Sequence, residues 1–187
     1  IGTTPRVLVL YTETAPYVFA CLDALVALSG ARIELVRWPV NTEAPFDTGS
    51  HPGITIHDRR AFDDRGLLAF AAGFDPHLVL ASGWVDKGYL RVCRALRRKG
   101  VPTSMNLDTA WRGGPRQWAS AVLARFWMRG TYSHVWATGS RQVEYARRLG
   151  LPADRILTGL YAADTGPMID AYPHAQAARR RRFPHRF

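Results

Sequence analysis

The segment NLDTAWRGG, which begins at Asn106, concentrates side chains that could take part in chemistry. Asp108 can accept hydrogen bonds from hydroxyl groups or act as a general base. Trp111 offers a flat apolar face that suits a sugar ring, and Arg112 suits a phosphate. Asn106 and Thr109 add polar groups. The alternative, in which Asp108 caps a turn and Trp111 packs over the sheet edge, stays open, but this density of groups favours a functional loop.

A second segment, ASGWVDKGY, combines Ser82 and Trp84 with Asp86 and Lys87 at the start of a helical pattern. A helix N-terminus beside a lysine suits an anion such as phosphate. For Asp86 a helix cap is the favoured interpretation. For Lys87 a binding role and a solvated charge are equally supported.

The first turn, YTETAPY, contributes Glu13 and Thr14. A catalytic role for Glu13 and a capping or solvated role are equally plausible. The turn has no glycine, which argues against the G-x-G-x-x-G contact of nicotinamide enzymes. There is no G-x-x-x-x-G-K-[ST] loop and no G-x-S-x-G elbow, and the histidines and cysteines lack metal-ligand spacing, so no metal site is expected.

Short apolar runs alternate with helical patterns along the chain, which predicts an α/β fold. The expected strands are 6–11, 32–38, 54–58, 76–84, 101–107, 133–138 and one around Ile156 and Leu157. The expected helices are 15–30, 59–74, 86–100, 114–131 and 139–150, with Ser140 as the N-cap of the last; beyond Ala162 we expect irregular chain and at most one short helix. This order predicts a Rossmann-like, doubly wound, mostly parallel sheet with helices on both faces.

In such sheets, ligands bind at the carboxyl ends of the strands. That rule turns the predicted strands into a candidate site. The residues concerned are Glu13 and Thr14, Ser82 to Lys87, Asp108 to Gly114, Gly139 with Ser140, and Tyr161.

The formal net charge of +10 could indicate a nucleic-acid partner, but its distribution argues against one. Arg179 to Arg182 and Arg186 supply five of those charges, and no acid follows Asp170. Four arginines at 112, 116, 125 and 129 could instead dock on anionic lipid headgroups, although an ordinary solvated face is favoured. The aromatic residues Trp118, Phe126, Trp127 and Trp136 are expected in the core.

The N-terminus lacks a signal-peptide layout, and no apolar stretch approaches the roughly 20 residues of a spanning helix. The two cysteines, Cys21 and Cys93, are expected to be buried free thiols. We therefore expect a cytoplasmic protein, with contact to the inner face of a membrane left open.

Three segments together resemble the N-terminal half of family-four glycosyltransferases, which have the GT-B fold of two Rossmann-like domains. They are RVLVLYTETAPY, DPHLVLASGWVDKGYLRVCRALRRKGVPTSMNLDT and SHVWATGSRQVEYARRLGLPADRILTGLYAADT. The most telling stretch contains Ser140, then LGLPADRI, then Asp164 near the expected interdomain linker. The resemblance covers roughly residues 6 to 165.

This resemblance implies an acceptor-binding domain of a glycosyltransferase whose donor is a nucleotide-diphosphate sugar. The acceptor would be a sugar, a lipid-linked compound or another small molecule, and a C-terminal domain would hold the donor. No cofactor is expected in this domain. The family often presents a histidine where this chain has Asp108, so Asp108 would contact an acceptor hydroxyl, or serve as a base if the enzyme inverts; most members retain configuration. The first loop, with Glu13 and Thr14, would lie near the donor diphosphate or the acceptor.

The expected domain organisation is an acceptor-side domain over 1–170, followed by a linker and the start of a donor domain over 171–187. In that interpretation the four consecutive arginines are a polar linker, and Phe183 to Phe187 begin a strand of the next domain. The isolated chain would then be inactive in transfer. The alternative function is a non-enzymatic Rossmann-like module that binds nucleic acid or another polyanion. A third alternative, a complete small α/β enzyme acting on a phosphorylated metabolite, would be favoured only if this chain alone turned over a substrate.

Overall fold

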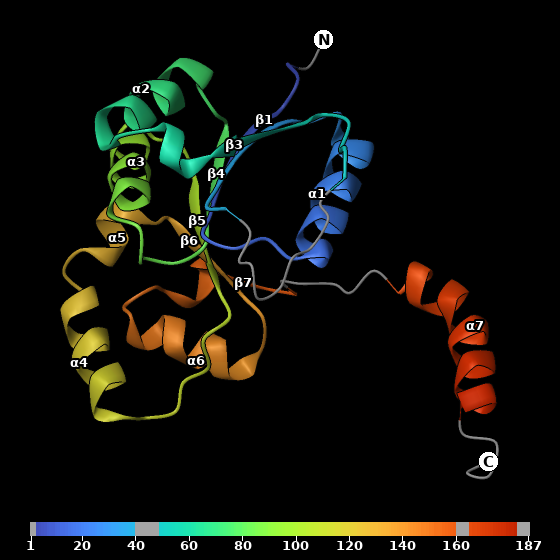
Figure 1. Ribbon diagram of the computed structural model, residues 1–187. Coiled ribbons are helices and arrows are strands. Elements are labelled where there is room, and N and C mark those ends of the chain that lie inside the picture. Colours follow the sequence, from blue (N-terminus) through green and yellow to red (C-terminus); the bar gives the residue numbers. More distant parts are fainter. Residues whose placement is uncertain (1–2, 40–48, 160–164, 183–187) are drawn as a thin grey trace.

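The computed structural model describes residues 3–39, 49–159 and 165–182. Seven strands form one open sheet in the order β3-β2-β1-β4-β5-β6-β7, and every neighbouring pair is parallel (Figure 1). The strands are β1 Arg6–Tyr11, β2 Arg32–Arg37, β3 Ile54–Asp58, β4 Leu78–Ala81, β5 Thr103–Leu107, β6 His134–Ala137 and β7 Ile156–Thr158. All seven coincide with predicted strands, and the Rossmann-like fold class is confirmed.

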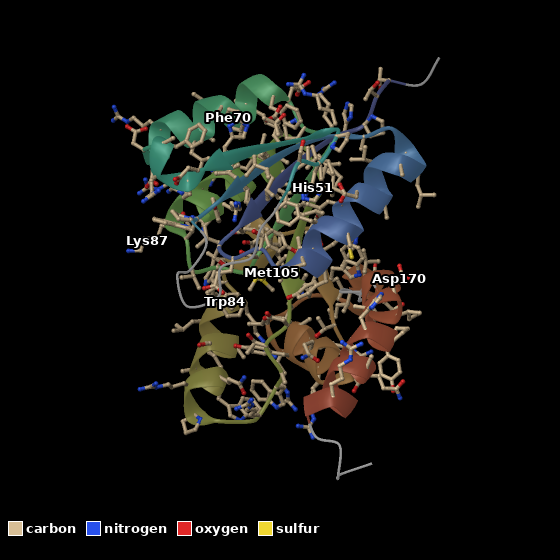
Figure 2. All side chains as sticks on the ribbon, turned by 45° about the vertical axis from the view of Figure 1, so that its right-hand side comes forward. His51, Phe70, Trp84, Lys87, Met105 and Asp170 are labelled. Carbon is tan, nitrogen blue, oxygen red and sulfur yellow. The ribbon has the colours of Figure 1, made fainter. Side chains whose placement is uncertain are left out.

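The central strands are apolar on both faces because helices cover both faces of the sheet. In β1, Val7 and Val9 face one layer, whereas Leu8 and Leu10 face the other; all four are buried. In the all-atom view, Met105 of β5 lies inside the molecule (Figure 2). Two hydrophobic cores therefore form, one on each side of the sheet.

The helices divide unevenly between these cores. They are α1 Pro16–Ser29, α2 Asp64–Phe74, α3 Lys87–Arg98, α4 Pro115–Ala124, α5 Met128–Thr131, α6 Ser140–Arg148 and α7 Gly166–Arg182, with 3₁₀ turns at Arg59–Ala61 and Ala153–Arg155. Helix α1 packs on one face, and buried residues of α2 to α6 belong to the core on the opposite face. In the described part of the chain, no helix combines the length and apolar character needed to cross a bilayer.

The strand order reverses between β1 and β4. From β1 the chain moves outward to β2 and β3, then returns through α2 to β4 and continues in the opposite direction. Loops leaving β1 and β4 diverge at such a switch point and leave a crevice at the carboxyl edge of the sheet. The fold thus sets the place of the site.

Three local predictions differ from the structure. The helix expected over 114–131 is divided into α4 and α5 by a turn over 125–127, and the Trp127 ring in that turn packs edge-on against Trp84. Gly139, not Ser140, occupies the N-cap position of α6, and no side chain caps that helix. Helix α7 occupies 166–182, where irregular chain and at most one short helix were expected.

The sequence hides α7 because its apolar residues form no stripe along one face and Pro173 lies inside it. Alanine and arginine, which favour helices intrinsically, fill its second half. The four arginines expected in a polar linker are therefore helical. Residues 160–164 and 183–187, which include Tyr161, Asp164 and the predicted next strand, lie outside the described residues.

Candidate functional site

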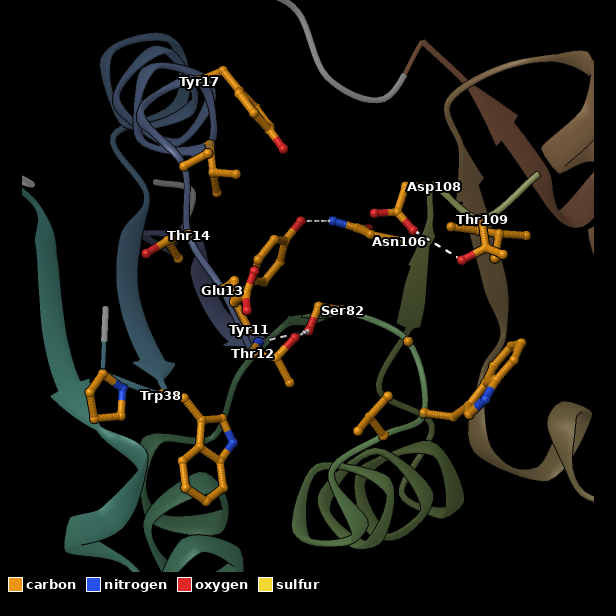
Figure 3. Close-up of a pocket in the computed structure, with 17 residues that line it drawn as sticks. Tyr11, Thr12, Glu13, Thr14, Tyr17, Trp38, Ser82, Asn106, Asp108 and Thr109 are labelled. Carbon is orange, nitrogen blue, oxygen red and sulfur yellow. Dashed lines mark hydrogen bonds between the residues drawn. The ribbon is translucent and has the colours of Figure 1, made fainter. Parts of the chain in front are cut away.

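A cavity of about 440 Å³ opens at the switch point, where the ends of four strands meet (Figure 3). The loop after β1, the residues after β2, the loop after β4 and the end of β5 all contribute walls. Its lining includes Tyr11, Thr12, Glu13, Thr14, Tyr17, Trp38, Ser82, Trp84, Asn106, Asp108 and Thr109. Seven of these were predicted as site residues, namely Glu13, Thr14, Ser82, Trp84, Asn106, Asp108 and Thr109.

Hydrogen bonds between loops fix the floor of this pocket. The Thr12 backbone N–H donates to Ser82 Oγ at 2.8 Å, and the two hydroxyls lie 3.1 Å apart. Ser82 is in turn held to β1 through its own N–H, which donates to the Leu10 carbonyl at 3.0 Å. The first loop and the β4 loop therefore form one rigid surface across the switch point.

Asn106 projects from β5 into the same crevice. Its Nδ2 donates to the Tyr11 hydroxyl, which connects β5 to β1 (Figure 3). Asn106 is only 5% exposed, and its Oδ1 has no hydrogen-bond partner among the described residues. A buried carbonyl oxygen without a partner costs stability, so this atom is ready to accept a hydrogen bond from a ligand hydroxyl.

Two carboxylates line the pocket without a cationic partner. Among the described residues, no ion pair involves Glu13 or Asp108. The Asp108 side chain accepts one long hydrogen bond, 3.4 Å, from the Thr109 hydroxyl, and its backbone carbonyl is held by Gln142 Nε2 at 2.7 Å. Burial, and then the negative charge of Asp108, raise the pKa of Tyr17, so that hydroxyl remains a donor at neutral pH.

Trp38 forms one edge of the pocket and is anchored from behind. Its Nε1 donates to Asp86 Oδ2 at 3.0 Å, and the Arg59 guanidinium lies 5.7 Å from its ring centre. Asp86 also accepts from Arg59 Nε at 2.9 Å and caps α3 through the Gly88 and Tyr89 N–H groups. The capping role predicted for Asp86 is confirmed, and the same carboxylate positions an aromatic ring at the site.

Hydrogen bonding determines the direction in which the pKa values of Asp86 and Arg59 are shifted. Burial alone would raise the pKa of Asp86, but hydrogen bonds from Arg59, the Tyr89 N–H and Trp38 outweigh it, and the pKa is lowered. Burial likewise acts to lower the pKa of Arg59, but Asp86 more than compensates and raises it. Both groups stay charged at neutral pH.

Lys87 lies outside the main pocket. It borders a second hollow of about 360 Å³, which shares Thr12, Trp38 and Val85 with the first. Figure 2 shows Lys87 at the periphery of the molecule. Lys87 therefore does not line the main pocket, and its binding role stays a prediction.

Trp111 and Arg112, which were also predicted as site residues, do not line the pocket. Trp111 is buried between α4 and α6, 5.2 Å from the Trp118 ring and 5.3 Å from the Tyr145 ring, with Arg148 over its face at 4.6 Å. Arg112 is exposed, and its backbone N–H donates to Gln117 Oε1 at 2.7 Å. The loop folds away from the crevice after Thr109.

Of the pocket residues named above, Tyr11, Thr12, Tyr17 and Trp38 were not predicted. Trp38 follows β2 directly, so the strand-end rule identifies it once the strand is ended at Arg37. Tyr11 is the last residue of β1, and Tyr17 is in the first turn of α1. No sequence signal separates these two from core aromatic residues.

The fold and the pocket define a Rossmann-like domain with a cavity at its topological switch point. The model of the glycosyl transferase 4-like domain matches residues 6–158, and the chain belongs to this family. The family resemblance stated from the sequence is thereby confirmed. No curated protein matches the sequence significantly.

Solved structures agree on the fold. UDP-N-acetylglucosamine 2-epimerase from Rickettsia bellii superposes with a TM-score of 0.59 at 14% identity, covering 92% of this chain and 48% of that one. Anabaena Alr3699/HepE, solved in complex with UDP and glucose, gives a TM-score of 0.58 at 13% identity, covering 93% and 50%. The chain thus spans about half the length of both proteins.

Proposed function

We propose that this chain is the acceptor-binding domain of a glycosyltransferase whose donor is a nucleotide-diphosphate sugar. The switch-point pocket holds the acceptor, and a second domain holds the donor. The observation that carries the proposal is the unpaired carboxylate of Asp108 at the carboxyl edge of the sheet, in a chain of this family.

The pocket chemistry supports an acceptor rather than a diphosphate. None of the described lining residues is lysine or arginine, whereas a diphosphate calls for cationic partners. Glu13, Asp108 and Asn106 instead offer acceptors to hydroxyl groups, and Ser82 and Thr12 offer hydroxyls of their own. A polyhydroxylated acceptor fits this set. Of the two roles predicted for the first loop, the pocket therefore favours acceptor binding.

Asp108 then binds and orients the attacking hydroxyl. We place transfer in the retaining class, in which the departing phosphate takes the hydroxyl proton and the protein needs no base. Asp108 would contribute one charge-assisted hydrogen bond to the acceptor. An inverting enzyme would use the same carboxylate as a general base, and the Asp108 variants argued in the Discussion separate the two.

The proposal is tested by incubating the full-length gene product with a panel of nucleotide-diphosphate sugars and a cellular extract as the acceptor source. Glycosylated products are detected by mass spectrometry. Transfer that fails with Asp108→Ala supports the proposal. A chain that turns over a phosphorylated metabolite alone would contradict it. So would salt-dependent nucleic-acid binding that survives deletion of residues 171–187, as expected for a binding module.

Trp38 provides a separate prediction. Trp38→Ala is expected to raise the acceptor KM roughly 3- to 10-fold, because an aromatic contact contributes about 0.5–1.5 kcal/mol. Trp38→Phe keeps a ring but loses the hydrogen bond to Asp86, so its effect should be smaller. The KM for the donor should not change in either variant.

Steady-state kinetics with each substrate varied in turn measure both effects. Tyr172→Ala, which removes an exposed aromatic ring on α7, is the matched control and should leave the acceptor KM unchanged. An unaltered acceptor KM in Trp38→Ala would remove Trp38 from the site.

A further inference from the structure

Helix α4 carries an exposed apolar surface that the pocket does not use. Ala121 and Ala124 are buried against the protein, whereas Trp118, Val122 and Leu123 of the same helix are exposed. Together with Phe126 in the following turn, these side chains are 49%, 55%, 64% and 86% exposed in chain order. The Trp118 ring is only half-exposed, because it also contacts Trp111 and Arg148. We call Trp118, Val122, Leu123 and Phe126 the α4 surface.

This exposure overturns the expectation that Trp118 and Phe126 belong to the core. Trp127 and Trp136, by contrast, are partly buried. An apolar outer face on a helix indicates an interaction site, because ordinary solvated helices present charged residues there. Figure 1 shows α4 at the outer edge of the helical layer, at the lower left, where its outer face is accessible.

The charges around the α4 surface have a single sign. Arg112 and Arg116 precede it, Arg125 and Arg129 follow it, and all four are exposed. No aspartate or glutamate occurs between Asp108 and Glu144 in the sequence. Glu144, on the neighbouring α6, is already paired with Arg148 at 2.6 Å.

We propose that the α4 surface docks on an anionic lipid bilayer. Trp118, Val122, Leu123 and Phe126 would enter the boundary between headgroups and acyl chains, and Arg112 and Arg116 would contact lipid phosphates. Arg125 and Arg129 add positive charge beside them, while their Nε atoms donate to the Arg148 and Gly150 carbonyls. Aliphatic side chains such as Val122 and Leu123 gain nothing from a nucleic-acid backbone. A symmetric contact with a second copy would place arginines against arginines. An anionic bilayer offers acyl chains to the apolar side chains of the α4 surface and phosphates to the arginines beside it.

Docking would also place the pocket close to the lipid surface, because the loop after Asp108 leads directly into α4. The consequence that the acceptor is lipid-linked rests on the proposed function. Binding to the bilayer does not, so the test below measures vesicles alone and can fail independently of any glycosyl transfer.

The experiment is flotation of the protein with vesicles of phosphatidylcholine mixed with phosphatidylglycerol, compared with pure phosphatidylcholine. Wild type is expected to float with the anionic vesicles only. The variant Leu123→Ser/Phe126→Ser should bind at least about tenfold more weakly. The variant Arg112→Gln/Arg116→Gln should lose about fivefold for each arginine.

Matched controls remove the same groups elsewhere. Leu28→Ser takes away a side chain of α1 that is 89% exposed, and Arg98→Gln/Lys99→Gln removes two exposed charges from the end of α3. Both should bind vesicles as wild type does. Because every substituted residue is exposed, circular dichroism melting should show that all variants fold.

Several results would overturn the proposal. Failure of wild type to float would do so, as would a charge control that loses as much binding as the α4 variants. Binding that depends only on Arg179 to Arg182 would assign the contact to α7. A change of oligomeric state in Leu123→Ser/Phe126→Ser by light scattering would assign the surface to a second copy. Tighter binding to polyuridylate than to vesicles, insensitive to the apolar variant, would assign it to nucleic acid.

Discussion

Asp108→Ala is expected to lower kcat/KM for glycosyl transfer by about 10- to 100-fold in the full-length protein. The carboxylate has no ion pair among the described residues, and its side-chain hydrogen bond comes from the adjacent Thr109. Its loss therefore removes a charged hydrogen bond to the acceptor, worth about 1.5–3 kcal/mol, and little else. The melting temperature should stay at the wild-type value because Asp108 is exposed.

Asp108→Asn distinguishes the two roles open to this side chain. A carboxamide still offers one oxygen to the acceptor hydroxyl but cannot take its proton. If Asp108 only binds the hydroxyl, Asp108→Asn should stay within about tenfold of wild type; a general base would lose about 10²- to 10⁴-fold. Asp154→Asn, an exposed aspartate on the second 3₁₀ turn, is the control. Wild-type kcat/KM in Asp108→Ala would remove Asp108 from the site.

The sequence predicts the architecture well because parallel strands leave strong local signals. Strands such as RVLVLY must be apolar on both faces, and each ends where turn residues begin. The strand-end rule then places Glu13, Ser82 and Asp108 in one crevice without further information. All three line the pocket.

The sequence does not predict the path of a loop, so the placement of residues along the segment from Asn106 to Arg112 differs from the one expected. The density of polar and aromatic groups from Asn106 to Arg112 suggested one site, but the chain turns after Thr109. Trp111 then packs under Arg148, contributed by a helix more than thirty residues away in the sequence. Trp118 and Phe126 were expected in the core but are exposed, because composition does not show which face of α4 is left uncovered. Tertiary packing decides both.

The buried Asp86–Arg59 pair gives the largest expected effect on stability. Asp86→Ala is expected to lower the free energy of unfolding by about 3–5 kcal/mol. It removes the cap of α3 and leaves Arg59, only 7% exposed, with fewer partners; the Phe62 carbonyl at 2.7 Å and Asp64 at 3.1 Å would remain. Urea denaturation followed by circular dichroism measures the change.

The chain offers a matched control at Asp58. This aspartate also pairs with an arginine, Arg60, and caps the adjacent 3₁₀ turn, but the pair is exposed. Asp58→Ala should therefore lower the free energy of unfolding much less than Asp86→Ala does. Equal losses in Asp58→Ala and Asp86→Ala would show that burial of the Asp86–Arg59 pair does not matter.

The same pair predicts a direction for acid sensitivity. Because the pKa of Asp86 is lowered in the folded state, its charge stabilises the protein above the unfolded-state pKa of about 3.9. That contribution is lost as the pH falls from there through the folded-state pKa. The difference in unfolding free energy between wild type and Asp86→Asn should shrink over this range. A difference that stayed constant with pH would mean that the Asp86 charge does not stabilise the fold.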